Sequence, residues 1–498
     1  MKSIIEVRQL TVKYYNTPRE ALKNITLKVS KGEVLVIAGP TGSGKSTLCY
    51  ILCGIIPKFI PAKVYGKVYI NGRDVNEIPQ QQLLTTINAL LQDPEAQLAL
   101  FSVSEEIMFP LENLGIPRDE ADKRLKWVVD LTYIRHLLSK YVNNLSYGEK
   151  QRVALASVLA LKPKILILDE PLAHQDYLAR KRIITLIDKL REEGITIIVT
   201  EHRILDLVKI ADRVVVLSNG EVIYEGDIEK LVKSNIPTKI GLRTLEVCSG
   251  YNKVKKEQVR SKIAIKVHDL SYAYGSREVL HGISFEVYEG EKVFIVGPNG
   301  SGKSTLGMCI AGILTPKRGY VKIMSRDVHK LNWKERVKLV GYVFQNPDLM
   351  LTSDSVSEEI RYGLNNLGLK REELDKRLNS ILNLLGLETL KDRDPHMLSR
   401  GERMIVAIAS LLAFNPRVLV LDEPFSGQDG NGVRRIFSIL NKIISKLNTT
   451  VLIITHDIDL INVYADRVIA LNSGYLLFKG TPERALEYLR RLNHEWDI

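Results

Sequence analysis

Two stretches of sequence decide the fold of this chain: Gly39-Pro40-Thr41-Gly42-Ser43-Gly44-Lys45-Ser46-Thr47 and Gly297-Pro298-Asn299-Gly300-Ser301-Gly302-Lys303-Ser304-Thr305. Each follows an apolar stretch and fits the pattern Gly-x4-Gly-Lys-Ser/Thr of a phosphate-binding loop. In such a loop, glycine amides surround phosphate groups, and the following helix presents its positive N-terminus to them. Lys45 and Lys303 would reach the β and γ phosphates, while Ser46 and Ser304 carry the hydroxyl that a magnesium ion needs.

The rest of the chain also contains an internal repeat. Gly39 and Gly297 are 258 positions apart, and later landmarks follow in the same order. Three pairs are 253 apart and one pair is 254 apart: Gln92 with Gln345, Ser146 with Ser399, Glu170 with Glu423, and His202 with His456. We therefore predict a first domain at residues 1–235, a basic linker at 236–261 and a second domain at 262–498. The drop in spacing predicts extra residues in a surface loop at Pro57–Val64.

Length and composition exclude several classes of protein. With 498 residues, 45% hydrophobic and 26% charged, the chain is too long for one ordinary domain and too apolar to be disordered. No apolar run reaches the eighteen or so residues that cross a bilayer, and the start lacks a signal-peptide pattern, so we expect a cytoplasmic location. The net charge of +12 favours anionic partners such as nucleotides, acidic lipid surfaces or nucleic acid, without choosing among them.

The four cysteines, Cys49, Cys53, Cys248 and Cys309, are too few and too scattered for a disulfide framework or a zinc ribbon. We expect them to be small buried hydrophobic residues.

The order of elements predicts an α/β fold in each half. The expected elements of the first half are strands at Val7–Val12, Ile25–Val29 and Val34–Ala38, a helix from Lys45, a helical stretch at Glu120–Leu138, and the strand–helix–strand series Ile165–Leu168, Tyr177–Glu193 and Ile195–Thr200. The second half repeats the helical stretch at Glu372–Leu385. This order predicts a parallel α/β core with an antiparallel β portion and a helical insertion.

Two adjacent carboxylates end a buried strand in each half. Asp169 and Glu170 follow Ile165–Leu168, and Asp422 and Glu423 follow the equivalent apolar stretch. Open parallel sheets bind ligands beyond the carboxyl ends of their strands. We predict that each aspartate holds magnesium through water and that each glutamate orients and polarises the attacking water.

The segments Leu145-Ser146-Tyr147-Gly148-Glu149 and Leu398-Ser399-Arg400-Gly401-Glu402 resemble the signature motif of ABC-type ATPases, which commonly ends Leu-Ser-Gly-Gly-Gln. Together with the other motifs, the resemblance covers nearly the whole chain outside the linker. It implies two P-loop ABC-type nucleotide-binding domains, each with a parallel α/β core, an antiparallel β subdomain and a helical subdomain. It also implies that ATP and Mg²⁺ are held between one half's phosphate loop and the other half's signature helix.

The resemblance assigns site residues one by one. In the first site, Tyr14 would stack on adenine, with Tyr15 or a packing role as alternatives, and Gln92 would link magnesium to a membrane partner. His202 would contact the γ-phosphate. The first site would combine Tyr14, Lys45, Ser46, Thr47, Gln92, Asp169, Glu170 and His202 with Ser399, Gly401 and Glu402, and the second would combine Tyr274, Lys303, Ser304, Thr305, Gln345, Asp422, Glu423 and His456 with Ser146, Gly148 and Glu149.

The chain departs from the family pattern at several positions. The third signature residue is Tyr147 or Arg400 instead of glycine, and Gln151-Arg152 of the first half becomes Met404-Ile405 in the second. The first site, which would borrow the second signature, is therefore predicted to be the less active one. Both halves carry a glutamine, Gln175 and Gln428, where the family usually has leucine, which we interpret as a trait of this lineage.

The segments after each glutamine narrow the resemblance. Gln92-Asp-Pro-Glu-Ala-Gln97 and Gln345-Asn-Pro-Asp, each followed by Val-Ser-Glu-Glu-Ile, resemble the ATPases of energy-coupling factor importers of vitamins, cobalt or nickel. This implies a peripheral ATPase at the cytoplasmic face of the membrane, with a transmembrane coupling subunit and a small substrate-binding membrane subunit as partners. Nucleic acid is not the expected partner. The alternatives are a soluble twin ATPase acting on ribosomes or nucleic acid, disfavoured by the short linker, and a sugar-importer ATPase, disfavoured by two intact loops.

Overall fold

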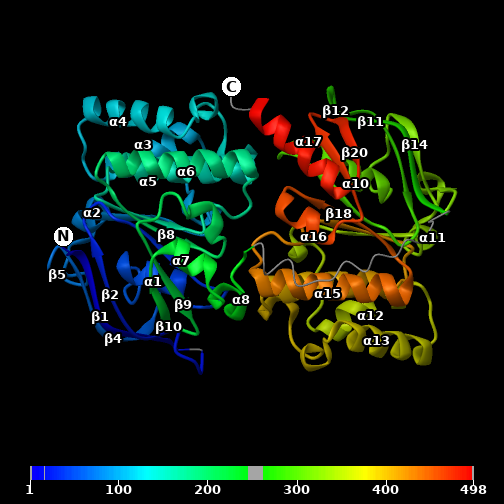
Figure 1. Cartoon of the computed structure of the whole chain (residues 1–498), viewed down its shortest axis with the longest axis horizontal. Helices are drawn as coiled ribbons and strands as arrows, with labels where there is room; N and C mark the ends of the chain where they lie inside the picture. Colours follow the sequence, from blue (N-terminus) through cyan, green and yellow to red (C-terminus); the bar gives the residue numbers. More distant parts are fainter. Residues whose placement is uncertain (1–2, 16, 245–261, 496–498) are drawn as a thin grey trace. The chain divides into compact units, whose positions relative to one another are not determined.

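The computed structural model describes residues 3–15, 17–244 and 262–495. This part of the chain forms two compact units, one centred on each repeat, and we describe each by itself (Figure 1). The predicted linker begins with the short helix α8 (Ile236–Ile240), and its residues 245–261 lie outside the described part. The exact domain boundaries therefore stay predictions.

The first unit contains two sheets. The antiparallel sheet has the order β2-β1-β4-β5, with β1 (Ser3–Tyr14), β2 (Leu22–Ser30), β4 (Ala62–Ile70) and β5 (Arg73–Asp74). The six-stranded sheet has the order β10-β9-β3-β8-β7-β6, with β3 (Val34–Ala38), β6 (Ile87–Leu90), β7 (Ile165–Asp169), β8 (Thr196–Glu201), β9 (Arg213–Ser218) and β10 (Glu221–Gly226). Its pairs are parallel except for the antiparallel hairpin of β9 and β10.

The second unit repeats this topology. Its antiparallel sheet has the order β12-β11-β14-β15, with β11 (Ile263–Tyr274), β12 (Arg277–Tyr288), β14 (Arg318–Ile323) and β15 (Arg326–Asp327). Its six-stranded sheet has the order β16-β17-β18-β13-β19-β20, with β13 (Lys292–Val296), β16 (Val340–Val343), β17 (Val418–Asp422), β18 (Thr450–Thr455), β19 (Arg467–Asn472) and β20 (Tyr475–Gly480).

Helices cover the six-stranded sheets and form a helical portion in each unit. The main helices of the first unit are α1 (Lys45–Leu52), α2 (Gln80–Thr86), α3 (Val103–Asn113), α4 (Arg118–Leu131), α5 (Tyr147–Ala160), α6 (Tyr177–Glu192) and α7 (Ile228–Lys233). Those of the second are α10 (Lys303–Ile310), α11 (Trp333–Arg336), α12 (Val356–Asn366), α13 (Arg371–Leu385), α14 (Arg400–Leu412), α15 (Gly430–Leu447), α16 (Ile461–Tyr464) and α17 (Pro482–Glu495). The predicted parallel core, antiparallel portion and helical insertion are all confirmed.

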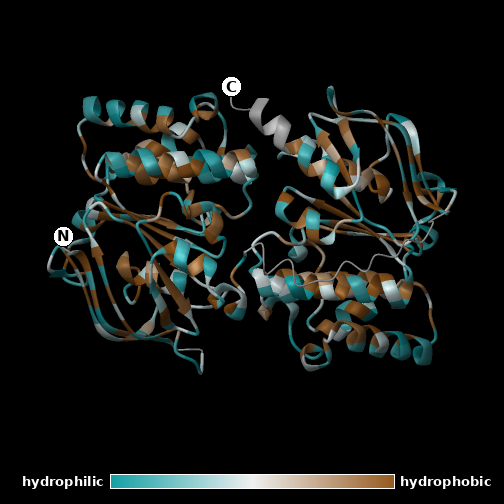
Figure 2. Cartoon of the chain, in the orientation of Figure 1, coloured by the Kyte–Doolittle hydropathy of each residue, from teal (hydrophilic) through white to brown (hydrophobic). Residues whose placement is uncertain are grey.

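Alternating side chains of the central strands build two cores in each unit. In β3, Val34 and Val36 face one hydrophobic cluster, which includes residues of α3 and α5, while Leu35 and Ile37 face a second cluster on the antiparallel sheet. Full burial of each such side chain stabilises the fold by about 2 kcal/mol. Figure 2 shows hydrophobic residues concentrated in the central strands and hydrophilic residues along α4 and α13. These cores hold the carboxyl ends of the parallel strands in fixed positions.

Two local predictions need correction. The inserted residues at Pro57–Val64 do not all form a surface loop, because Ala62, Lys63 and Val64 belong to β4 and pair with Tyr14, Lys13 and Val12 of β1. The insertion thus extends the antiparallel ladder up to Tyr14. The helix predicted to reach Leu138 ends at Leu131, because Tyr133 adopts a left-handed conformation (φ 55°), and a short 3-10 turn follows.

The cysteine prediction is confirmed for Cys49 and Cys309, which are buried, whereas Cys53 is only partly buried and Cys248 lies outside the described residues. Burial raises the pKa of the Cys53 thiol, and that of Cys309, to about 12. Both thiols are therefore protonated and unreactive at neutral pH.

Candidate active sites

The predicted site residues of each unit gather at one edge of the six-stranded sheet. In the first unit the phosphate loop follows β3, Gln92 follows β6, Glu170 follows β7 and His202 follows β8. Because β3, β8, β7 and β6 run parallel, their carboxyl ends meet at the same edge. The second unit places its equivalent residues in the same way.

Backbone sterics dictate the phosphate loop. Gly44 is the N-cap of α1 and lies in the left-handed region (φ 105°), where a Cβ would be 2.5 Å from the Ala21 carbonyl oxygen. A glycine is therefore required at this position. Lys45 donates from Nζ to the carbonyl oxygens of Gly39 (2.9 Å) and Pro40 (3.1 Å), so its own loop holds the ammonium group in place.

The loop of the second unit is built alike. Gly302 caps α10 with φ 93°, and Lys303 Nζ donates to Gly297 O and Pro298 O, both at 2.9 Å. The hydroxyls of Ser43 and Ser301 are buried, and neither has a hydrogen-bond partner within the described structure. Free hydroxyls next to uncapped helix N-termini and a fixed ammonium group suit the phosphates of a nucleotide.

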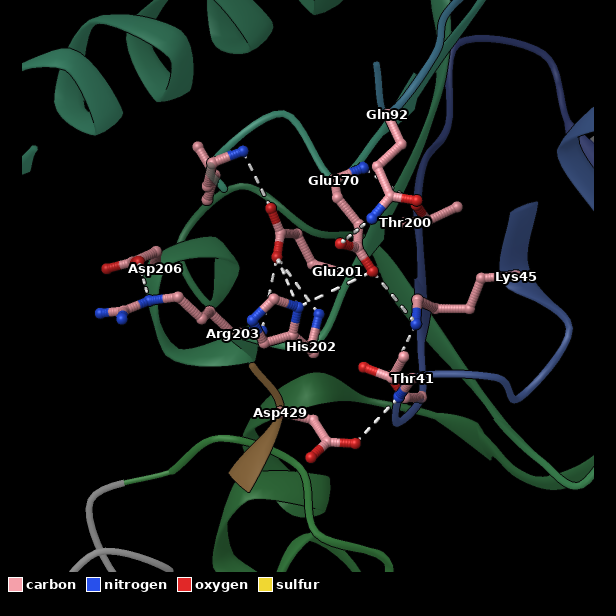
Figure 3. Close-up of polar contacts among 12 residues, drawn as sticks. Thr41, Lys45, Gln92, Glu170, Thr200, Glu201, His202, Arg203, Asp206 and Asp429 are labelled. Atoms are coloured by element: carbon pink, nitrogen blue, oxygen red, sulfur yellow. Dashed lines mark hydrogen bonds and ion pairs between the residues drawn. The ribbon is translucent and has the colours of Figure 1, made fainter. Parts of the chain in front are cut away.

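Glu170 lies at the centre of the polar network in the first unit (Figure 3). Its carboxylate is 3.3 Å from Lys45 Nζ, accepts a hydrogen bond from Gln92 Nε2 (3.1 Å) and is 3.8 Å from His202 Nδ1. Its backbone is left-handed (φ 52°), and so is that of Glu423 (φ 47°). Strained backbone at the same position in both halves is typical of a functional residue that its surroundings hold in place.

Glu423 contacts the histidine of its own unit more closely. His456 approaches Glu423 Oε1 through Nδ1 (2.8 Å) and through its backbone amide (2.9 Å), and the Thr455 hydroxyl donates to Oε2 (3.2 Å). Each glutamate therefore has several cationic or polar groups around its carboxylate.

Charged neighbours keep both glutamates ionised. Burial acts to raise the pKa of Glu170, but His202 and Lys45 outweigh it and lower the pKa to about 2. The pKa of Glu423 is lowered in the same way, with His456 and Lys303 outweighing burial. A carboxylate that stays ionised at neutral pH can accept hydrogen bonds from water and polarise it.

The two aspartates fit a magnesium ion. Burial raises the pKa of Asp169 and Asp422, and hydrogen bonds from hydroxyl groups oppose that rise. In each carboxylate, one oxygen (Asp169 Oδ2 and Asp422 Oδ1) is buried with no hydrogen-bond partner within the described structure. Such an oxygen costs free energy unless a cation or an ordered water satisfies it. A hard cation with oxygen ligands matches this chemistry.

The signature segments form the N-termini of two helices. Ser146 caps α5, and Ser399 caps α14, each in a capping box with the glutamate three residues later. Gly148 and Gly401 lie beside Gln175 and Gln428 of their own units: a Cβ on Gly401 would be 2.6 Å from Gln428 Oε1, and one on Gly148 would be 3.4 Å from Gln175 Oε1. The loop after Glu170 and the loop after Glu423 are therefore each packed on the signature helix of the same unit.

The departures at the third signature position have visible contacts in the first unit. Tyr147 donates from its hydroxyl to Gln92 O (3.1 Å) and packs edge-on against His174. The signature helix is thus connected to both the glutamine and the loop after Glu170. Gln151 donates to Pro171 O and accepts from Gln175, whereas its counterpart Met404 is buried in the hydrophobic core.

The tyrosines predicted to stack on adenine differ in their burial and in their contacts. Tyr14 is partly buried, and its hydroxyl is 3.1 Å from Thr47 Oγ1 of the phosphate loop, while its rival Tyr15 is exposed. Tyr274 is half exposed and packs edge-on against Tyr272, with ring centroids 4.9 Å apart. Gln345 is exposed. The contact with Thr47 favours Tyr14 over Tyr15.

Sequence reasoning did not single out Glu201. This buried carboxylate accepts hydrogen bonds from the amides of Leu172 (2.9 Å) and His202 (3.2 Å), and so joins the loop after Glu170 to the predicted γ-phosphate histidine. Burial raises the pKa of Glu201. The sequence feature that could have revealed Glu201 is an acidic residue at the end of an apolar strand, at the position where the second half has Thr455.

Comparison with known proteins agrees with this geometry. The model of the ABC transporter family matches residues 22–173 and 280–426. A Methanosarcina acetivorans protein named as an ABC transporter ATP-binding protein is 37% identical over 476 residues, which cover 95% of this chain and 89% of that protein. The chain belongs to the ABC transporter family. It is an ATP-binding subunit and an ATPase, with two ABC domains fused in one chain.

Two further relatives carry more specific names. A Bacillus subtilis protein named as the HMP/thiamine import ATP-binding protein YkoD is 31% identical over 506 residues, which cover 96% of this chain and 92% of that protein. The solved structure of cbiO1 from Clostridium perfringens, described as part of the ABC transporter complex cbiONQ, is 34% identical, covers 48% of this chain and all of its own, and has a TM-score of 0.43. Within the described residues of this ABC ATPase, we find no helix with the length and apolar character of a membrane span.

The lowered pKa of Glu170 predicts a pH dependence of stability. A carboxyl whose pKa is depressed in the folded state stabilises the fold above its unfolded pKa, near 4.5, and that stabilisation is lost as pH falls towards 2. It amounts to at most about 3 kcal/mol. We expect the melting temperature of the wild-type ABC ATPase, minus that of Glu170→Gln, to decrease steadily between pH 5 and pH 3. Thermal unfolding without nucleotide measures this, and the exposed Glu192→Gln serves as control. A pH-independent difference would contradict the pairing.

Proposed function

We propose that this ABC ATPase drives an energy-coupling factor importer of a vitamin or a transition-metal ion. The observation that carries the proposal is the similarity to the HMP/thiamine import ATPase over nearly the full length of both chains. The Gln-Asp-Pro and Gln-Asn-Pro segments after β6 and β16 support the same subfamily. The name of that relative favours a vitamin over a metal ion as the cargo.

We assign the residues of each site as follows. In the first half, Asp169, Ser46 and Gln92 would hold Mg²⁺, and in the second half Asp422, Ser304 and Gln345 would do so. The ion, when bound, would neutralise charge on the β and γ phosphates. Glu170 and Glu423 polarise the attacking water, and His202 and His456 contact the γ-phosphate. The ion pair between Lys45 and Glu170 would give way when a phosphate group takes Lys45 as its partner, which frees Glu170 for water.

From the family resemblance we also propose that each ATP is completed by the signature of the other half. Ser399, Gly401 and Glu402 would serve the first phosphate loop, and Ser146, Gly148 and Glu149 the second. The capping boxes support this role, because they keep each signature serine at the positive end of a helix. ATP would then hold the halves together until it is hydrolysed.

Exposed apolar side chains support a transmembrane coupling subunit as the partner. Phe109 of α3 and its repeat equivalent Tyr362 of α12 are 44% and 62% exposed, and Phe101 lies exposed just before α3. A contiguous patch of exposed apolar side chains commonly marks a protein contact, and we propose that these residues contribute to such a patch. We place the chain at the cytoplasmic face of the membrane as a peripheral subunit, with a small substrate-binding membrane protein completing the complex.

The assignment of the water-polarising residues predicts the phenotype of a double variant. Glu170→Gln combined with Glu423→Gln should lower Mg-dependent ATP hydrolysis at least about 100-fold, because general-base assistance is lost in both sites. Nucleotide binding should persist, since the phosphate loops are intact. A phosphate-release assay with the purified chain measures the loss, with Glu192→Gln as control. Retained turnover in the double variant would refute the assigned role.

If each signature completes the ATP site of the other half, serine variants of the two signatures should lower ATP hydrolysis unequally. In a Lys303→Ala background only the first half binds ATP, so Ser399→Ala should lower hydrolysis more than Ser146→Ala, by about tenfold. The order should reverse in a Lys45→Ala background. Both serine variants lose the same type of helix cap, which makes each the matched control of the other. Equal losses in both backgrounds would contradict the exchange.

Partner binding predicts the effect of charge on the exposed aromatic residues. Phe109→Glu with Tyr362→Glu should abolish recovery of membrane subunits when the tagged chain is purified from native membranes. ATP hydrolysis by the isolated chain should stay within about twofold of wild type, because both side chains lie on the surface. Tyr65→Glu, an exposed position in the antiparallel sheet, is the control. Mass spectrometry identifies the partners, and recovery of soluble partners alone from wild type would contradict a transport role.

A further inference from the structure

The two halves hold their strand-end aspartates with hydroxyls from different strands. In the first half, Thr200 near the end of β8 donates a hydrogen bond to Asp169 Oδ1. In the second half, Tyr342 of β16 donates from its hydroxyl to Asp422 Oδ2 (2.7 Å). Both hydroxyls and both carboxylates are buried. In each case one carboxylate oxygen accepts this hydrogen bond, and the other has no hydrogen-bond partner among the residues that the structure describes.

Strand register shows that these are exchanged positions. Asp169 pairs with Thr200, and Asp422 pairs with Ile454, so Ile454 stands where the first half has its hydroxyl donor. On the other side of the aspartate strand, Ala89 pairs with Ile167, and Tyr342 pairs with Val420 at the equivalent place. Each half therefore has one hydroxyl donor and one apolar residue at these two positions, in opposite order.

A third position changes with them. Gly307 of α10 is the repeat equivalent of Cys49 of α1. A Cβ on Gly307 would be 2.5 Å from Ile454 Cδ1 and 3.0 Å from Tyr342 Cε2. The tyrosine ring and the isoleucine thus fill the space that Cys49 occupies in the first half, next to smaller neighbours. Three coordinated differences conserve packing and at the same time keep one hydroxyl on the carboxylate.

We propose that Tyr342 and Thr200 are positioning residues for the metal-binding aspartates of their respective halves. This inference rests on the proposed magnesium sites. Each hydroxyl holds one oxygen of a buried carboxylate, so that the other oxygen stays fixed in orientation and open to the cation. A hydrogen bond from a hydroxyl to a buried carboxylate is strong, and it costs no reorganisation when the ion arrives. The two sites reach the same geometry through different residues.

The test measures the Mg²⁺ concentration that half-saturates nucleotide binding in one half at a time. The full-length chain carries Lys45→Ala to report on the second half, or Lys303→Ala to report on the first. Binding of a radiolabelled, non-hydrolysable ATP analogue is followed by equilibrium dialysis during a Mg²⁺ titration and, separately, in EDTA. In the first background Tyr342→Phe should raise the half-saturating Mg²⁺ about fivefold, the value of one lost hydrogen bond. In the second background Thr200→Val should do the same.

A transplanted hydroxyl provides the decisive control. Ile454→Thr added to Tyr342→Phe places the hydroxyl where the first half has it, and it should return the half-saturating Mg²⁺ to within about twofold of the background value. Binding in EDTA should be the same for all variants, because the phosphate loop is unchanged.

Three results would overturn the inference: an unchanged Mg²⁺ dependence in Tyr342→Phe, a failure of the transplanted hydroxyl to restore it, or an equal loss of binding in EDTA. The last would show a purely structural role. Failure of the proposed magnesium sites looks different, since nucleotide binding in both backgrounds would then be independent of Mg²⁺ even with Tyr342 and Thr200 intact.

Discussion

The structure of each half depends on one electrostatic constraint: two adjacent carboxylates must be kept at the end of a buried strand. Burial disfavours the charged form of both carboxylates, and a different neighbouring group stabilises each of them. Lys45 and His202 keep Glu170 ionised, while a hydroxyl satisfies one oxygen of Asp169. The phosphate loop, the central strand order and the histidine after β8 can all be understood as the surroundings that make this pair tolerable.

The order of the parallel strands places those partners beside the two carboxylates. The site residues come from four stretches of sequence that are far apart in the chain. They meet because the four strands before them end at the same edge of the sheet. The hydrophobic clusters on both faces of the sheet fix that edge, so the polar groups beyond it cannot relax away from one another. The left-handed backbone of Glu170 and Glu423 is the local cost of turning both acids towards the loop.

Much of this could be predicted from sequence, for reasons that differ between residues. The phosphate loops are recognisable because glycine is the one residue that fits Gly44, and the strands because their apolar runs are buried on both faces. The conformation of the insertion was predicted wrongly, because pairing of Lys63 with Lys13 depends on a partner strand far away in sequence. Glu201 was missed for a similar reason: its role depends on the amide of Leu172, which only the folded chain brings near.

The repeat itself explains why the two sites can differ in detail. In each half a hydroxyl donates to the aspartate, but a different strand supplies it. Position 454 carries an isoleucine where position 342 carries a tyrosine, and the side chains of both lie too close to Gly307 to leave room for a Cβ there. On our proposal, these three differences together preserve the hydrogen bond to the aspartate of the second half, although the residues there differ from those of the first half. Position-by-position comparison of the halves would count three differences, yet physically they are one conserved interaction made in two ways.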